Sequence, residues 1–230
     1  MSDQWWSGIR ERVAELGARE SAGKVFGAYG HGWILADPLS ADDLADLEAQ
    51  LGVELPEEYR TFLTRVGAGG AGPAYGLFPV RYAEQRWQWE GDGADMTKTS
   101  LLALPFPGSP HPAAEAVERL RAERPDEDEY DDEDAFETAY EAWEEQWYDI
   151  FLGPARTAGA IVISHLGCAL REWLIVSGPH RGTVWSDPRA DDADLEPLLD
   201  PEGRPVTFRN WYTRWLEEAE HTALGTAPGA

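Results

Sequence analysis

The chain begins with apolar residues at helical spacing. Trp5, Ile9, Val13 and Leu16 lie three or four positions apart, and Gly17 follows as a stop signal. We expect a helix here, followed by a glycine-rich loop. Residues 1–32 would then precede the main domain.

A pair of short helices is predicted between residues 40 and 67. Ser40 is a favourable N-cap for the first helix, Asp43 occupies the capping-box position, and Gly52 follows the last turn. The second helix begins at Pro56, a residue suited to a first turn. Their predicted buried faces consist of Leu44, Leu47, Leu51, Tyr59, Phe62, Leu63 and Val66.

Glycines cluster directly after this pair, and Gly67, Gly69 and Gly72 match the GxGxxG pattern of dinucleotide-binding loops. Such a loop needs a strand before it and a helix after it, so that a helix N-terminus meets the phosphate. Here the helix comes first, and an extended segment follows Pro73. We therefore predict a helix-to-strand turn, in which glycines supply positive φ and close backbone approach.

Three segments rich in β-branched and aromatic residues are typical of strands. They cover residues 160–167, 170–178 and 182–187 and are separated by glycine-containing turns. Their order predicts an antiparallel meander. The earlier segment RWQW places Trp87 and Trp89 on one face if it is extended.

A closing helix is indicated by Phe208, Trp211, Tyr212 and Trp215, and residues 224–230 are predicted to form a disordered tail. Helices followed by strands and a last helix favour an α+β fold over an alternating βαβ fold. We expect an antiparallel sheet with helices packed against it.

Residues 125–150 differ from the rest, because they contain thirteen acidic and no basic residues within a chain of net charge −24. The first part is predicted to be a solvated loop and the second an amphipathic helix. One face of that helix carries Phe136, Tyr140, Trp143, Trp147 and Ile150, and the other carries Glu137, Glu141, Glu144 and Glu145. This aromatic seam has two interpretations: it packs on the protein's own sheet, or part of it contacts a partner.

The overall charge limits the kinds of molecule that the chain could bind. With 43 acidic against 19 basic residues, the chain is poorly suited to nucleic acid, and a positively charged protein is a better partner. The single cysteine excludes an intramolecular disulfide and suits a reducing compartment. No signal-peptide pattern and no membrane-spanning apolar run is recognised, so we expect a soluble cytoplasmic protein.

Residues that could perform chemistry do not form a familiar pattern. His165 and Cys168 are three positions apart, which in a strand places them on opposite faces, so we expect a buried structural role. Asp92 and Asp95 lie in a segment that is shorter than a calcium loop and lacks its final Glu. We predict no catalysis, no cofactor and no specific metal site. Weak cation binding by the acidic run, and a hydrolase using His165 or the acidic cluster, are the alternatives.

The segment LGxxLPxxYxxFL, followed by a glycine-rich turn with GxxYGLF, resembles the SUKH superfamily of fungal cell-wall assembly regulators and bacterial immunity proteins. A looser similarity covers residues 33–216. It suggests one SUKH-like domain at 33–223, with the acidic segment as an insertion at about 110–152. The residues that carry the resemblance are Gly52, Leu55, Pro56, Tyr59, Phe62, Leu63, Gly70, Gly72, Pro73, Tyr75, Gly76, Leu77, Phe78, Trp173 and Trp185.

This resemblance implies a small α+β domain that performs no chemistry, and bacterial members are inferred to neutralise toxins, many of them nucleases. The leading hypothesis is an immunity protein that covers the substrate site of a basic toxin, with Trp143 and Trp147 as anchors. The alternative is a regulatory protein-interaction module without a toxin partner. The predicted contact acids are Asp126, Glu127, Asp128, Glu129, Asp131, Asp132, Glu133, Asp134, Glu141, Glu144 and Glu145.

Overall fold

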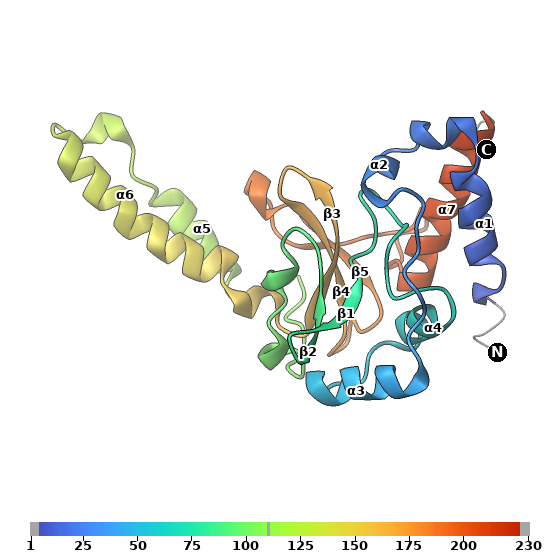
Figure 1. Cartoon of the computed structure of the whole chain (residues 1–230). Coiled ribbons are helices and arrows are strands. Elements are labelled where there is room, and N and C mark those ends of the chain that lie inside the picture. The colour runs from blue at the N-terminus through green and yellow to red at the C-terminus, as the bar shows by residue number, and fades with distance from the viewer. Residues whose placement is uncertain (1–4, 110, 226–230) are drawn as a thin grey trace.

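The computed structural model describes residues 5–109 and 111–225, and it consists of a body with a projecting helical hairpin (Figure 1). The helices are α1 (Ile9–Gly17), α2 (Ala28–His31), α3 (Ala41–Leu51), α4 (Glu57–Arg65), α5 (Ala114–Ala122), α6 (Glu133–Trp147) and α7 (Phe208–Leu224). The strands are β1 (Val80–Ala83), β2 (Arg86–Trp89), β3 (Ala160–Gly167), β4 (Leu170–Ile175), β5 (Val184–Asp187) and β6 (Glu196–Pro197). Residues 226–230 of the predicted tail lie outside the described range.

The main sheet is antiparallel, with strand order β3-β4-β5-β6. Ala160 faces Ile175 across β3 and β4, and Trp173 faces Trp185 across β4 and β5. The predicted meander is therefore confirmed, with the short β6 added at its edge. A separate two-stranded sheet pairs β1 with β2, and it buries Trp87 and Trp89 on one face as predicted.

Helices α1, α4 and α7 cover the body on the side away from the hairpin, and α3 lies along its lower end (Figure 1). Aromatic rings dominate the contact between α4 and α7: the ring centroids of Phe62 and Tyr212 lie 4.7 Å apart, and those of Phe208 and Tyr59 lie 4.9 Å apart. Trp173 and Trp185 are buried in the same main core. The α+β class, with helices packed against an antiparallel sheet, is confirmed. None of the described helices is long and apolar enough to cross a membrane.

The local helix signals are mostly confirmed. Ser40 and Asp43 form both hydrogen bonds of the capping box at the start of α3. The predicted face of α1 needs one correction, because Trp5 is 61% exposed and Trp6 takes the buried position. Trp5 precedes α1, so the helical spacing does not apply to it; instead, the guanidinium of Arg209 lies 4.6 Å from its ring.

The glycine cluster forms the predicted turn between α4 and the extended chain. Gly69 and Gly70 have φ values of 114° and 108°. A Cβ on Gly70 would lie 2.2 Å from the carbonyl oxygen of Ile34, so the backbone approach leaves no room for a side chain. Leu77 then bridges Gly70 and Ser164, which joins the turn to β3.

The expected burial of Cys168 is wrong. Cys168 and Ala169 are the two central residues of the β3–β4 turn, with φ values of 49° and 61°, and Cys168 is exposed. Positive φ at both central positions is typical of a type I′ hairpin turn, so Cys168 lies in the turn after β3, which ends at Gly167 as predicted. His165 remains in β3, where its ring lies 4.7 Å from that of Tyr75.

Candidate functional site

The acidic segment belongs to a helical hairpin formed by α5 and α6, which projects from the body beside the sheet (Figure 1). We call residues 114–152, from α5 to the π-helical turn that follows α6, the acidic hairpin. Helix α5 was not predicted. Its signal is present in retrospect, since Val117 and Leu120 lie one turn apart among strong helix formers.

A small core of its own holds the acidic hairpin together, and none of its members belongs to the main core. Its buried residues are Val117, Leu120, Trp143, Trp147 and Phe151. Trp143 and Trp147 stack with their centroids 5.5 Å apart, and the Trp143 indole donates a hydrogen bond of 2.7 Å to the carbonyl of Leu120.

Trp143 and Trp147 are each 8% exposed, so the two predicted anchors are buried in the isolated protein, and contact of another part of the seam with a partner stays a prediction. The other interpretation is corrected, because both rings pack on α5 rather than on the sheet. The physical reason is that α5 supplies an apolar face much closer than the sheet does. The rings nearer the tip are less covered: Phe136 lies 5.7 Å from both Tyr130 and Tyr140 and is only partly buried.

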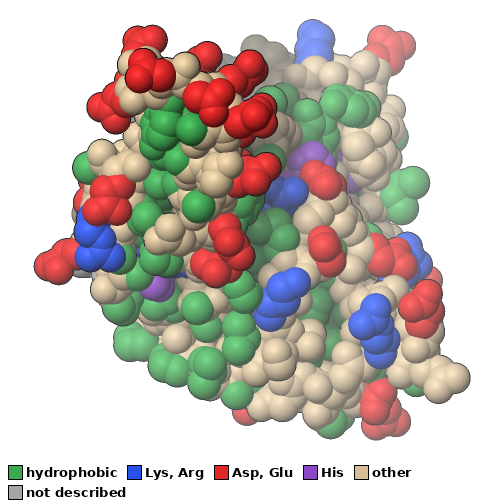
Figure 2. All heavy atoms as spheres, turned by 90° about the vertical axis from the view of Figure 1, so that its left-hand side faces the viewer, with side chains coloured by type: hydrophobic (Ala, Val, Ile, Leu, Met, Phe, Trp, Pro, Cys, Tyr) green, Lys and Arg blue, Asp and Glu red, His purple; other side chains and the backbone are tan. Residues whose placement is uncertain are grey.

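The predicted contact acids lie on the surface of the acidic hairpin. Glu144 is partly buried, and the other ten are exposed. Figure 2 looks onto this end of the molecule and shows acidic side chains gathered over the upper part of the face. Among the described residues, no ion pair includes any of the thirteen acids between Asp126 and Asp149.

Their spacing in α6 is unfavourable for the isolated protein. Glu137, Glu141 and Glu145 follow one another at intervals of four, so like charges are neighbours along one line of the helix. Each such pair destabilises a helix by about 0.2–0.5 kcal/mol. The acidic hairpin therefore concentrates negative charge at a cost in stability.

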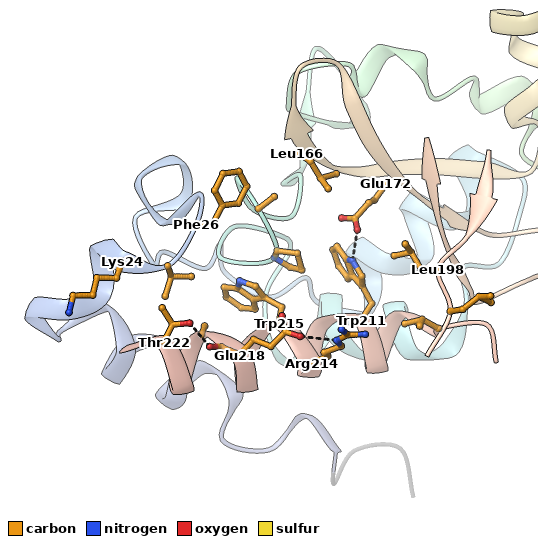
Figure 3. A pocket seen from close by; sticks show the side chains of 16 residues that line it. Lys24, Phe26, Leu166, Glu172, Leu198, Trp211, Arg214, Trp215, Glu218 and Thr222 are labelled. Carbon is orange, nitrogen blue, oxygen red and sulfur yellow. Dashed lines mark hydrogen bonds and ion pairs between the residues drawn. The ribbon is translucent and has the colours of Figure 1, made fainter. Parts of the chain in front are cut away.

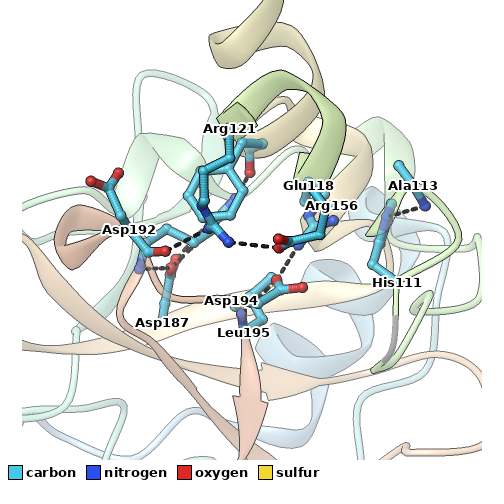
Figure 4. A network of polar contacts seen from close by, with 11 residues as sticks. His111, Ala113, Glu118, Arg121, Arg156, Asp187, Asp192, Asp194 and Leu195 are labelled. Atoms are coloured by element: carbon cyan, nitrogen blue, oxygen red, sulfur yellow. Dashed lines mark hydrogen bonds and ion pairs between the residues drawn. The ribbon is translucent and has the colours of Figure 1, made fainter. Parts of the chain in front are cut away.

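Buried charges fix the base of the acidic hairpin to the body (Figure 4). Arg189 donates two hydrogen bonds to the carboxylate of Asp187, at 2.7 and 2.6 Å, and a third of 3.3 Å to the carbonyl of Phe151. Trp173 donates another to Asp187 at 2.9 Å. Burial alone would raise the pKa of Asp187, but the hydrogen bonds and positive charge of Arg189 outweigh it and hold the pKa below its ordinary value.

Further contacts attach α5 and the segment that follows the acidic hairpin to the same loop of the body. Arg121 of α5 donates to the carbonyl of Asp192 at 2.8 Å, and the buried Arg156, just after α6, pairs with Asp194 (Figure 4). Burial, and then the charge of Arg156, lower the pKa of nearby His111. The hairpin is thus held by directional polar contacts, which favour one orientation relative to the body.

Residues 38–185 match the SMI1 / KNR4 family (SUKH-1), and this range is more than half of the chain. The chain belongs to the SUKH-1 family. No curated protein and no solved structure matches it. The matched range includes the acidic hairpin, which is therefore carried within the SUKH-1 region rather than appended to it.

The residues that carry the resemblance to SUKH proteins stabilise the fold of this SUKH-1 chain. Most of their side chains lie in the main core, namely Leu55, Tyr59, Phe62, Leu63, Leu77, Phe78, Trp173 and Trp185. Tyr59 illustrates their role, since its hydroxyl accepts a 2.9 Å hydrogen bond from Trp89. Across residues 5–109 and 111–225, no cluster of three or more potential metal-binding side chains is found.

Proposed function

We propose that this SUKH-1 protein is a non-catalytic binding protein that neutralises a toxin with a basic surface, and that it does so in the cytoplasm. The unpaired acids of the projecting hairpin carry this proposal. Carboxylates that form no ion pair with a described residue are available to Lys and Arg of another protein, and their long-range field accelerates encounter.

The cost of this charge supports a role in binding. Repulsion between neighbouring glutamates of α6 lowers the stability of the helix. No ion pair among the described residues compensates this repulsion. A basic partner would remove this repulsion on binding. Natural proteins retain destabilising arrangements at sites where function requires them.

The proposed mechanism is occlusion. A nuclease binds the phosphates of its substrate with a basic surface, and the acidic hairpin would occupy that surface with carboxylates. The polar contacts of Asp187, Arg189 and Arg121 orient the hairpin before binding, which reduces the entropy lost on association. The partly buried rings of Tyr130 and Phe136 would supply apolar contact at its tip.

The test uses the product of the gene adjacent to the one that encodes this chain. The two proteins are co-expressed and co-purified, and the activity of the partner is assayed with and without the full chain. We expect stoichiometric inhibition and an association rate that falls as salt is raised from low to physiological concentration.

Two matched variants test the surface. The first neutralises Asp126, Glu127, Asp128 and Glu129 to Asn or Gln, which keeps the side-chain oxygen that caps the following turn. The second neutralises four exposed acids of the body, namely Glu11, Glu15, Asp42 and Glu217. Both change the net charge equally, so only the first should slow association about tenfold or more. Equal effects would contradict the assignment to the hairpin, and binding without inhibition would contradict neutralisation.

A further inference from the structure

A pocket lies between α7 and the sheet. Figure 1 shows α7 on the opposite side of the body from the acidic hairpin. The pocket has a volume of about 610 Å³, which is within the range of small-molecule sites. Its walls include Phe26 before α2, Pro73 of the glycine turn, Leu166 of β3, and Trp211 and Trp215 of α7 (Figure 3).

One charged group lies deep in this mostly apolar pocket. Glu172 of β4 is 7% exposed, and its Oε1 accepts a 3.0 Å hydrogen bond from the indole of Trp211. Its Oε2 is buried without a hydrogen-bond partner, and no ion pair among the described residues includes Glu172. Burial raises the pKa of this carboxyl to about 7, although the hydrogen bond from Trp211 opposes the shift.

The other charged side chains of the pocket lie at its outer end. Arg214 pairs with Glu218 at 2.8 Å, and Lys24 is exposed (Figure 3). They therefore leave the inner carboxyl uncompensated. An uncompensated buried carboxylate is costly in a folded protein and is typical of a functional site.

The apolar walls are also unusual. Phe26 and Leu199 flank the pocket and are 64% and 51% exposed, although both are large apolar side chains. The indole N–H of Trp215 is a second buried polar atom without a partner. A ligand in the pocket would cover these apolar surfaces, and the indole faces of α7 would favour a positive charge beside them.

We propose that the pocket binds a small organic cation: an aliphatic or aromatic body that carries one ammonium group. The ammonium donates a hydrogen bond to Glu172 Oε2, and the body packs against Trp211 and Trp215. The ligand supplies the positive charge that the protein itself does not place beside Glu172. This site is independent of the acidic hairpin and of the function proposed for it.

Three probes of equal length test the charge preference: octylamine, 1-octanol and octanoate, titrated calorimetrically into the full chain at pH 8. Octylamine is expected to bind about tenfold or more tightly than 1-octanol, because it forms a charge-assisted hydrogen bond in a desolvated site. Octanoate should bind most weakly, since its charge repeats that of Glu172. This ranking uses the unmodified protein, so it does not depend on the folding of any variant.

Two variants locate the effect. Glu172→Gln keeps the oxygen that accepts from Trp211 but removes the charge, so the preference for octylamine over 1-octanol should fall to less than about threefold. Glu217→Gln removes the same charge from an exposed position of α7 that does not line the pocket, and it should leave the octylamine affinity within about twofold. The proposal is overturned if wild type binds 1-octanol or octanoate as tightly as octylamine, if none of the probes saturates, or if Glu172→Gln keeps the preference of wild type.

Discussion

Replacement of Glu172 by glutamine is expected to stabilise the protein increasingly as pH rises. Glu172 is buried in β4 without a positive partner among the described residues, and burial raises its pKa from an ordinary value of 4.5 to about 7. The folded state therefore binds this proton more tightly than the unfolded state. Below pH 4.5 the protonated group causes no penalty, and stability is lost as pH rises through 7.

The size of the effect follows from the two pKa values. Linkage gives a loss of about 1 kcal/mol in the free energy of unfolding at pH 5 and about 3 kcal/mol at pH 8, relative to the fully protonated protein. Glutamine does not titrate in this range. The stability of Glu172→Gln relative to wild type should thus increase by about 2 kcal/mol or more between pH 5 and pH 8.

Urea unfolding of both proteins at pH 5, 6, 7 and 8 measures this difference. Burial lowers the pKa of His31 to about 4, so His31 also affects stability below neutral pH, but it is present in both proteins and cancels. Glu218→Gln is the matched control, because it makes the same change at an exposed position and should differ from wild type by no more than about 0.5 kcal/mol at every pH. A difference between Glu172→Gln and wild type that does not grow with pH would refute the inference that Glu172 is buried and unpaired.

Three further predictions address the hairpin, the glycine turn and the buried ion pair. Trp143→Ala should destabilise the acidic hairpin by about 3 kcal/mol. Amide hydrogen exchange should become faster in α6 but not in β4, because the two cores share no buried residue. Equal acceleration in both elements would contradict this separation. Gly70→Ala should destabilise the body by at least about 2 kcal/mol in urea unfolding. Gly23→Ala is the control: a Cβ at that position meets no atom within 4 Å, so the change should be close to neutral. A tolerated Gly70→Ala would show that the turn adapts. Asp187→Asn should lower the free energy of unfolding by about 3–5 kcal/mol at pH 7, because it leaves Arg189 buried without a counter-charge. A urea midpoint unchanged from wild type would show that this pair does not hold the base of the hairpin.

The two candidate surfaces of this SUKH-1 protein use charge in opposite ways. The acidic hairpin exposes many carboxylates to solvent, where they act at long range and are screened by salt. Glu172 is a single carboxyl in a largely apolar pocket, where it acts only at contact and is little screened. Salt dependence therefore distinguishes the two sites: added salt should weaken binding at the hairpin strongly and binding in the pocket only slightly.

Elements defined by local chemistry were predictable from the sequence. The capping box at Ser40, the glycines that close the turn before Leu77, and the alternation of buried residues in β2 each depend on neighbours within a few positions. The spacing of Trp211 and Trp215 likewise determined the buried face of α7. Such signals do not need knowledge of the rest of the chain, because the hydrogen bonds and periodicities that they reflect are local.

What covers each apolar face was decided only by the tertiary structure. The sequence determined that Trp143 and Trp147 share one face of a helix, but the folded chain placed α5 against that face, and so made them core residues of a hairpin. It also brought Glu172 of β4 under Trp211 of α7 and left its second oxygen unpaired. Periodicity records which side chains must leave water, whereas the partner that removes them from water is set by contacts between residues distant in the chain.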